Sequence, residues 1–132
     1  MSVMGTDYRN EEPMSYTIEI SHAFQGVIDP ALDDASIYID WEPDGHDPDE
    51  YLVRLALVTQ ALRQGFNRKI TRTGTVVELD QIGIEVLREE AVYRMEWANN
   101  NAAFEFGGDR MRWFGMARSA RAMINRIDKV TA

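Results

Sequence analysis

One stretch of the sequence, from Asp80 to Phe106, constrains the fold more than any other. Read as a helix, it carries two apolar stripes where a surface helix carries one. The first stripe holds Ile82, Val86, Tyr93, Trp97 and Phe104, and the second holds Ile84, Leu87, Ala91, Met95, Ala98, Ala102 and Phe106. Apolar residues recur about 11 positions apart, close to three turns of an ideal helix, so both stripes run nearly straight. We therefore expect a central helix that is covered on two sides.

The second half of this stretch also fits a different structure. Tyr93, Met95 and Trp97 alternate with polar residues, and the run of three asparagines that follows would suit the turn of a β-hairpin. Asparagine is also a weak helix former. Both apolar stripes nevertheless continue through the asparagines at helical spacing, so helix is the preferred interpretation and the hairpin stays as the alternative.

Earlier in the chain, two segments have the pattern of strands. Residues 16–21 and 36–41 alternate apolar and polar side chains and are rich in β-branched or aromatic residues. We expect them to pair antiparallel. Between them, Gly26, Asp29-Pro30 and Asp33-Asp34 predict turns and loop.

A strong helix-start signal follows in the acidic segment. Asp47 is placed as the N-cap, Pro48 at the first helical position, and Glu50 completes a capping box. The helix is predicted to end at Gln64, before a left-handed cap at Gly65 with Phe66 as its apolar contact. Its apolar face would consist of Leu52, Leu55, Ala56, Thr59 and Leu62.

The remaining elements complete the predicted fold. Residues 67–71 and 75–79 suit a short β-hairpin. Asp80 can cap the central helix, and Gly107-Gly108 would end it. Asp109 would then cap a last helix that runs to Lys129. The prediction is an α+β fold, with a small antiparallel sheet of about four strands and one packed helix, followed by a C-terminal two-helix hairpin. Residues 14–132 would form a single domain, divided into 14–79 and 80–132, after a flexible arm over residues 1–13.

The distribution of charge limits the classes of partner. The net charge is −8, but residues 1–50 carry −12, residues 51–108 are neutral and residues 109–132 carry +4. The acidic half argues against general nucleic-acid binding, because it repels phosphate. No apolar run approaches the roughly 18 residues of a membrane span, the N-terminus does not resemble a signal peptide, and there is no cysteine. We expect a cytoplasmic protein.

Catalytic and metal-binding signals are weak. Asp40, Asp44 and His46 lie in an acidic segment that begins like a calcium loop, but Tyr51 stands where the bidentate glutamate is required. These three residues remain the candidates for a metal site or for an acid-cluster enzyme. No known phosphate-binding, zinc-protease or serine-hydrolase motif is present, so we expect no cofactor and no catalytic residues.

The best candidate ligand site lies on the predicted hairpin. If the last two helices fold back on each other, the asparagine run and the arginines of the last helix converge on one surface, where they could bind a nucleotide-like anion. The predicted ligand residues are Asn99, Asn100, Asn101, Arg110, Arg118 and Arg121. The alternative is that these arginines contact the acidic half of a neighbouring chain.

Assembly is the clearest functional expectation. The second apolar stripe and the apolar face of the last helix exceed what a small sheet can cover, so we predict a homo-oligomer, with an interface at Trp97, Trp113, Met116 and Met123. The leading function is that of a small acidic interaction protein without enzymatic activity, of the kind that phages and mobile elements use to bind a host component. An oligomeric binder of an anionic small molecule and a metal-dependent enzyme are the alternatives.

Overall fold

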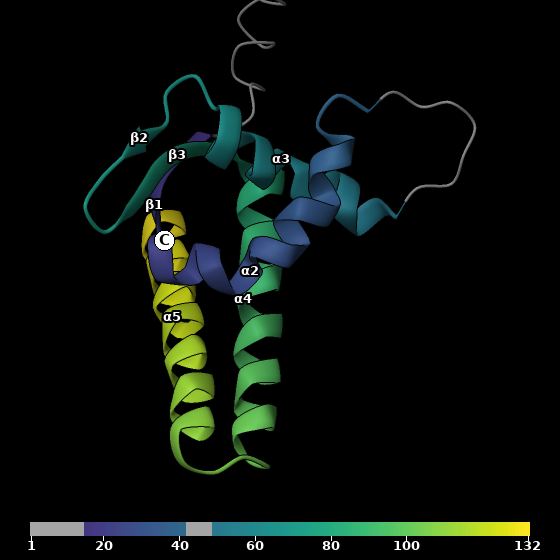
Figure 1. The fold of residues 1–132 in the computed structure, drawn as a ribbon. Coiled ribbons are helices and arrows are strands. Elements are labelled where there is room, and N and C mark those ends of the chain that lie inside the picture. The colour runs from purple at the N-terminus through teal and green to yellow at the C-terminus, as the bar shows by residue number, and fades with distance from the viewer. Residues whose placement is uncertain (1–14, 42–48) are drawn as a thin grey trace, which may run out of the picture.

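The structure, a computed structural model, describes residues 15–41 and 49–132. The fold is α+β, with a three-stranded antiparallel sheet, two helices packed beside it, and a long C-terminal hairpin of two more helices (Figure 1). The elements are, in chain order, β1 (Ser15–Ser21), α2 (His22–Ala35), the 3-10 turn η1 (Ser36–Tyr38), α3 (Glu50–Gln64), β2 (Lys69–Ile70), β3 (Gly74–Asp80), α4 (Gln81–Ala102) and α5 (Gly107–Thr131).

The sheet is built around β3. β1 pairs with the whole of β3, with Ile18 opposite Val77, and β2 contributes only two residues on the other side. The alternation predicted for residues 16–21 is confirmed, because Ile18 and Ile20 are buried while Thr17 is exposed. The sheet therefore has one apolar face, which joins a core with residues from α2, α3, α4 and α5.

The prediction of a loop after β1 was wrong. Residues 22–35 form α2, which the side chain of Ser21 caps by accepting a hydrogen bond from the Phe24 N–H (3.1 Å). Pro30 lies inside this helix and removes one of its backbone hydrogen bonds. Burial outweighs that local cost, because one face of the helix enters the core, with Phe24, Val27, Ile28, Leu32 and Ala35. Two helices, and not one, therefore pack beside the sheet.

The second predicted strand is also absent. Residues 36–38 form η1, a 3-10 turn that continues from the end of α2, and Ile37 is 72% exposed. The hydroxyl of Ser36 donates to the carbonyl oxygen of Asp33 (2.7 Å), which satisfies one of the free carbonyls at the helix end. The alternation of Ile37, Ile39 and Trp41 was therefore misleading, and the sheet has three strands instead of about four.

The helix predicted after the acidic segment exists, but it begins later. α3 starts at Glu50, and Asp49 is its N-cap, since its carboxylate accepts from the N–H groups of Tyr51 (3.0 Å) and Leu52 (3.4 Å). Asp47 and Pro48 lie outside the described residues. The predicted apolar face is largely confirmed, with Leu55, Ala56, Thr59 and Leu62 buried.

The predicted end of α3 at Gln64 is confirmed, but the predicted cap was wrong. Gly65 has a φ of −59°, so it is not left-handed, and Phe66 is 99% exposed and makes no apolar contact. Glycine is needed at this position for a different reason. A Cβ atom there would lie 2.5 Å from the carbonyl oxygen of Ala61.

The C-terminal hairpin was predicted correctly, apart from its turn. Asp80 caps α4 by accepting from the Gly83 N–H (2.8 Å), and the helix continues through the asparagine run, which rejects the β-hairpin alternative. α4 ends at Ala102, four residues before Phe106. Gly107 and Gly108 open α5, where Asp109 lies in the first turn and is not the cap. The φ of Gly107 is +66°, a conformation that favours glycine.

The cap of α4 provides a test of the fold. We expect Asp80→Ala to lower the free energy of unfolding by about 1 kcal/mol, because the N–H of Gly83 loses its acceptor. Urea denaturation followed by circular dichroism measures this change. Asp34→Ala is the control, since the Asp34 side chain is exposed and makes no hydrogen bond or ion pair to another described residue. An equal effect from both substitutions would contradict the capping role.

Candidate functional site

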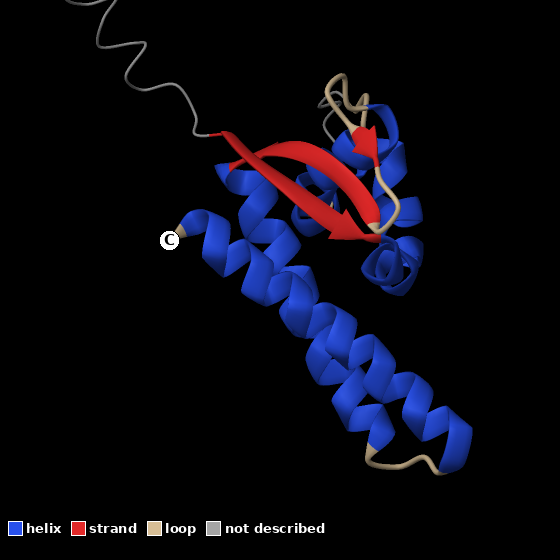
Figure 2. Cartoon of the chain, turned by 90° about the vertical axis from the view of Figure 1, so that its left-hand side faces the viewer, coloured by secondary structure: helices blue, strands red, loops and turns tan. Residues whose placement is uncertain are grey.

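The helical hairpin is the most distinctive feature of the molecule. α4 and α5 lie side by side and extend well beyond the sheet, with their connecting loop at the far end (Figures 1 and 2). In the half of α4 nearer the sheet, most inward positions are buried by the core. Beyond Val92, the only buried residues of α4 are Ala98 and Ala102. Among the described residues, the outer half of the hairpin is therefore covered only by its own two helices.

A buried carboxylate lies where the hairpin leaves the core. Glu90 is 3% exposed, and its carboxylate accepts hydrogen bonds from the Tyr51 hydroxyl of α3 and from Arg94 Nε (2.8 Å). The Arg94 side chain is itself 17% exposed. Removing one partner from such a buried ion pair typically costs about 3–5 kcal/mol. This cluster joins α4 to α3 by polar contacts in addition to apolar packing.

The environment of Tyr51 keeps its hydroxyl protonated. Burial raises the pKa of Tyr51 well above its ordinary value, and the hydrogen bond to Glu90 and the negative charge of that residue raise it further. The hydroxyl therefore acts as a fixed donor to the carboxylate. Sequence reasoning missed this cluster, since the two residues are 39 positions apart and Glu90 follows another glutamate, a pattern typical of an exposed helix face.

Further along the hairpin, aromatic side chains join the two helices. The rings of Trp97 and Trp113 meet edge to face, with centroids 4.7 Å apart. The Arg94 guanidinium lies 5.3 Å from the centroids of both the Tyr93 and Trp97 rings. Such cation–π contacts contribute about 0.5–2 kcal/mol. Both tryptophans are half-buried in the single chain, so each keeps part of its ring exposed.

The structure brings three of the six predicted ligand residues together. Asn99, Arg118 and Arg121 line one shallow groove between α4 and α5, with a volume of about 330 Å³. Its other lining residues are apolar, namely Met95, Met111, Phe114 and Ala117. Two guanidinium groups and an amide beside an exposed aromatic ring could bind an anion that carries a planar group. We refer to this feature as the arginine groove.

The other three predicted ligand residues do not line this groove. The Asn101 amide donates to the carbonyl oxygen of Trp97 (2.7 Å), one turn earlier in the same helix. Asn100 is exposed on another side of α4. The Arg110 guanidinium lies 5.4 Å from the centroid of the Phe114 ring, at the edge of the groove.

The end of the hairpin exposes two large apolar side chains. Phe104 is 82% exposed and Phe106 is 84% exposed, in the loop that joins α4 to α5. They belong to the two apolar stripes of the sequence, but α4 ends before them. The packing of α4 against α5 therefore does not bury them. We call these two residues the tip patch.

The predicted interface residues differ in accessibility. Trp97 and Trp113 are half-buried, and Met116 packs partly against the core. Met123 is 2% exposed and belongs to the core of the single chain. Of the four, only Met123 has almost no surface for a partner.

The acidic segment is only partly described. Asp40 is exposed in a turn, while Asp44 and His46 lie outside the described residues. Among residues 15–41 and 49–132, no three histidine or acidic side chains come close enough to hold a metal ion. No helix in these ranges is long and apolar enough to cross a membrane.

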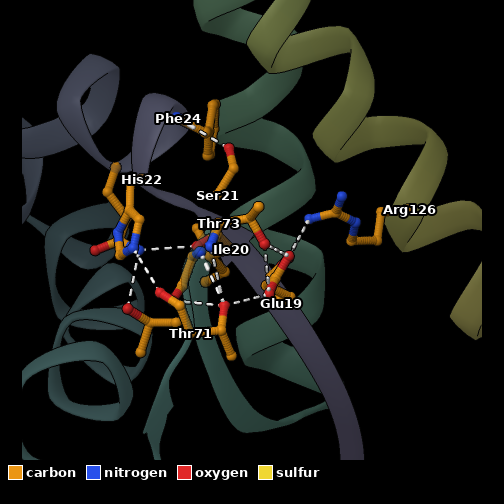
Figure 3. A network of polar contacts seen from close by, with 11 residues as sticks. Glu19, Ile20, Ser21, His22, Phe24, Thr71, Thr73 and Arg126 are labelled. Carbon is orange, nitrogen blue, oxygen red and sulfur yellow. Dashed lines mark hydrogen bonds and ion pairs between the residues drawn. The ribbon is translucent and has the colours of Figure 1, made fainter.

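A second polar cluster connects the sheet to α5 and is structural in character. The Glu19 carboxylate accepts from the hydroxyls of Thr71 (2.6 Å) and Thr73 (3.1 Å), and both bonds lower the pKa of Glu19 (Figure 3). Arg126 of α5 donates to the Glu19 carbonyl oxygen (2.8 Å), and His22 contacts the carbonyl oxygen of Thr71 (3.0 Å). These contacts fix the β2–β3 turn against β1 and the end of α5.

Comparisons with protein-family models, with curated proteins and with solved structures found no match to this chain.

The buried carboxylate provides a second test. We expect Tyr51→Phe to lower the free energy of unfolding by about 1–3 kcal/mol, because Glu90 loses a donor while remaining buried. Chemical denaturation measures the change. Tyr93→Phe is the matched control, since Tyr93 is 57% exposed and its hydroxyl bonds to no other described residue. If Tyr51→Phe were as mild as the control, the cluster would not anchor the hairpin.

Proposed function

We propose that this protein is an interaction protein that binds a partner protein through the tip patch of its helical hairpin. The observation that carries the proposal is the exposure of Phe104 and Phe106 at the end of a projecting arm. Single exposed apolar residues are ordinary on protein surfaces. Two phenylalanines in one short loop that are more than four-fifths exposed, at the end of the hairpin, offer a surface that another molecule can bury.

The chemistry around the tip patch suits a protein partner. Charges of both signs surround it, with Glu105 and Asp109 beside Arg110 and Arg112, and Arg112 lies 3.7 Å from the Asp109 carboxylate. An apolar centre with a mixed polar rim is typical of protein–protein interfaces. The net charge of −8 disfavours anionic membranes and nucleic acids.

The shape of the hairpin supports the same function. Aromatic anchors that enter a pocket of the partner supply most of the binding free energy in many complexes. An arm that extends from the sheet can insert such anchors while the rest of the protein stays outside. Because no other described element covers the outer half of the hairpin, a partner can approach the loop from several directions.

Site-specific photo-crosslinking tests this proposal. A photoreactive phenylalanine analogue at position 106 should crosslink a specific partner protein in a lysate of the source cells, and Phe104→Ser in the same chain should weaken that crosslink at least tenfold. The tenfold change corresponds to about 1.4 kcal/mol. The purified partner should then bind the unmodified protein in a direct titration.

The control uses another exposed phenylalanine. Phe66 is 99% exposed but lies at the end of α3, away from the hairpin loop. The analogue at position 66 should not capture the same partner. Recovery of the same proteins from both positions, or a crosslink at position 106 that Phe104→Ser leaves unchanged, would refute the proposal.

The arginine groove supports a second candidate function, the binding of a nucleotide-like anion. The observation that favours it is the convergence of Asn99, Arg118 and Arg121 on one hollow with an aromatic wall. Neither arginine forms a hydrogen bond or an ion pair with another described residue, so both are available to an anion.

Thermal denaturation with a panel of nucleotides tests this second function. A ligand present at 100 times its dissociation constant should stabilise the fold by about 2.7 kcal/mol. Arg118→Ala should abolish that shift. Arg112→Ala should preserve it, since Arg112 is on the same helix but does not line the groove. A shift that survives Arg118→Ala would place the ligand elsewhere.

A further inference from the structure

Two hollows lie end to end along one side of the hairpin. The arginine groove is the outer one, and the inner one has a volume of about 520 Å³. A single row of α4 residues connects them, with Arg88 and Val92 in the inner hollow and Met95 and Asn99 in the outer one. Residues at this spacing share one helix face. The two hollows therefore form one continuous surface, which we call the groove face.

The two ends of the groove face carry opposite charge. The inner hollow contains Glu85, Glu89 and Glu96, and its one arginine, Arg88, is already bonded to Asp128 (2.9 Å). The outer hollow contains Arg118 and Arg121 and no acidic side chain. Glu85 lies 4.0 Å from the Arg54 guanidinium and accepts from the Gln81 amide (2.9 Å). Within the described part of the chain, the side chains of Glu89, Glu96, Arg118 and Arg121 make no hydrogen bond or ion pair. If a second copy of the groove face is turned end to end, its acidic end therefore lies opposite the basic end of the first copy.

The centre of the groove face is apolar. Val92 and Met95 are partly buried and lie between the acidic and basic ends. Tyr93, 57% exposed, and Phe114, 37% exposed, add aromatic surface on either side. An apolar centre flanked by unpaired charges of opposite sign favours one specific occupant, which is an identical surface in antiparallel orientation.

We infer that a second copy of this chain docks on the groove face, about a two-fold axis that passes near Val92. In this arrangement Arg118 and Arg121 of each copy meet Glu85 and Glu89 of the other. The helix rise sets the register, because Glu85 and Asn99 lie about 10 Å on either side of Val92. A two-fold axis near Val92 therefore places Glu85 of one copy opposite Asn99 of the other. Asn99 lies beside the two arginines in the outer hollow. Arg88 would similarly face Glu96 of the second copy.

The size of the face sets the expected strength of the dimer. Two helices, each about 10 Å across, over a length of about 25 Å offer roughly 500 Å² per copy. The two copies together would bury roughly 1,000 Å², slightly below the about 1,200 Å² in total at which standard specific interfaces begin. We therefore expect a dimer with a dissociation constant in the micromolar range. The inference does not depend on the tip patch, whose two phenylalanines lie outside the groove face.

Charge reversal tests the inference. The protein should dimerise between about 1 and 300 µM in size-exclusion chromatography with light scattering, a range that brackets a micromolar constant. The variant R118E/R121E should be monomeric there, and so should E85K/E89K. An equimolar mixture of the two should restore a dimer, because every position again faces an opposite charge: one set of ion pairs is native, and the other has its charges exchanged. A nucleotide site at the same arginines would be kept by E85K/E89K alone, so it does not predict loss in both variants and recovery in the mixture.

A cysteine crosslink tests the position of the axis and does not require the charge variants to fold. The chain has no cysteine, so Val92→Cys introduces a single thiol. Near a two-fold axis, the two thiols come within disulfide distance, and mild oxidation should give a covalent dimer. Phe66→Cys, on an exposed residue away from the groove face, should not crosslink at the same concentration.

Three results would overturn the inference. These are a monomer over the whole concentration range, a dimer that R118E/R121E leaves intact, and equal crosslinking at positions 92 and 66. Loss of the dimer in both charge variants with recovery in the mixture supports it. The tip-patch variant Phe104→Ser should still dimerise, so failure of partner binding and failure of dimerisation are distinguishable.

Discussion

The close packing of α4 against α5 is the contact on which the rest of the molecule depends. Both buried faces contain alanine, with Ala91, Ala98 and Ala102 on α4 and Ala117 and Ala120 on α5. Small side chains let two helices approach closely, and the distance between helix axes follows the size of the residues at the contact. The hairpin can therefore hold together beyond the sheet, where no third element of the described ranges covers it.

That packing has a consequence for the surface. Alanine fills little volume, so in the outer half of the hairpin the larger apolar side chains lie at the sides of the contact and not inside it. Trp97, Trp113, Met95 and Phe114 all occupy such positions, partly covered and partly accessible. The arginine groove and the groove face both form along these sides. Surface available for binding is thus a direct result of how the two helices pack.

The base of the hairpin is fixed by more than apolar burial. Glu90 is held between Tyr51 of α3 and Arg94 one turn along α4, and Arg126 of α5 bonds to the backbone of β1. Polar contacts are directional, so they orient the arm relative to the sheet more narrowly than apolar contacts can. A rigid base lets the hairpin present its loop and its groove face at defined positions.

Local chemistry determined much of this fold from the sequence alone. β1, the C-terminal part of α3, the start of α4 at Asp80 and the fold-back of α5 follow from alternation, caps and apolar spacing within a few residues. The convergence of Asn99 with Arg118 and Arg121 was predictable for the same reason, because an antiparallel hairpin fixes which turns lie opposite. α2 was not predictable in this way, since Gly26, Pro30 and three aspartates signal a loop and only the burial of Phe24 and Ile28 outweighs them. The same holds for Glu90. Only the tertiary structure decides that this glutamate is buried, because its partner Tyr51 comes from a different helix and the free energy of that contact exists only once the two helices have packed.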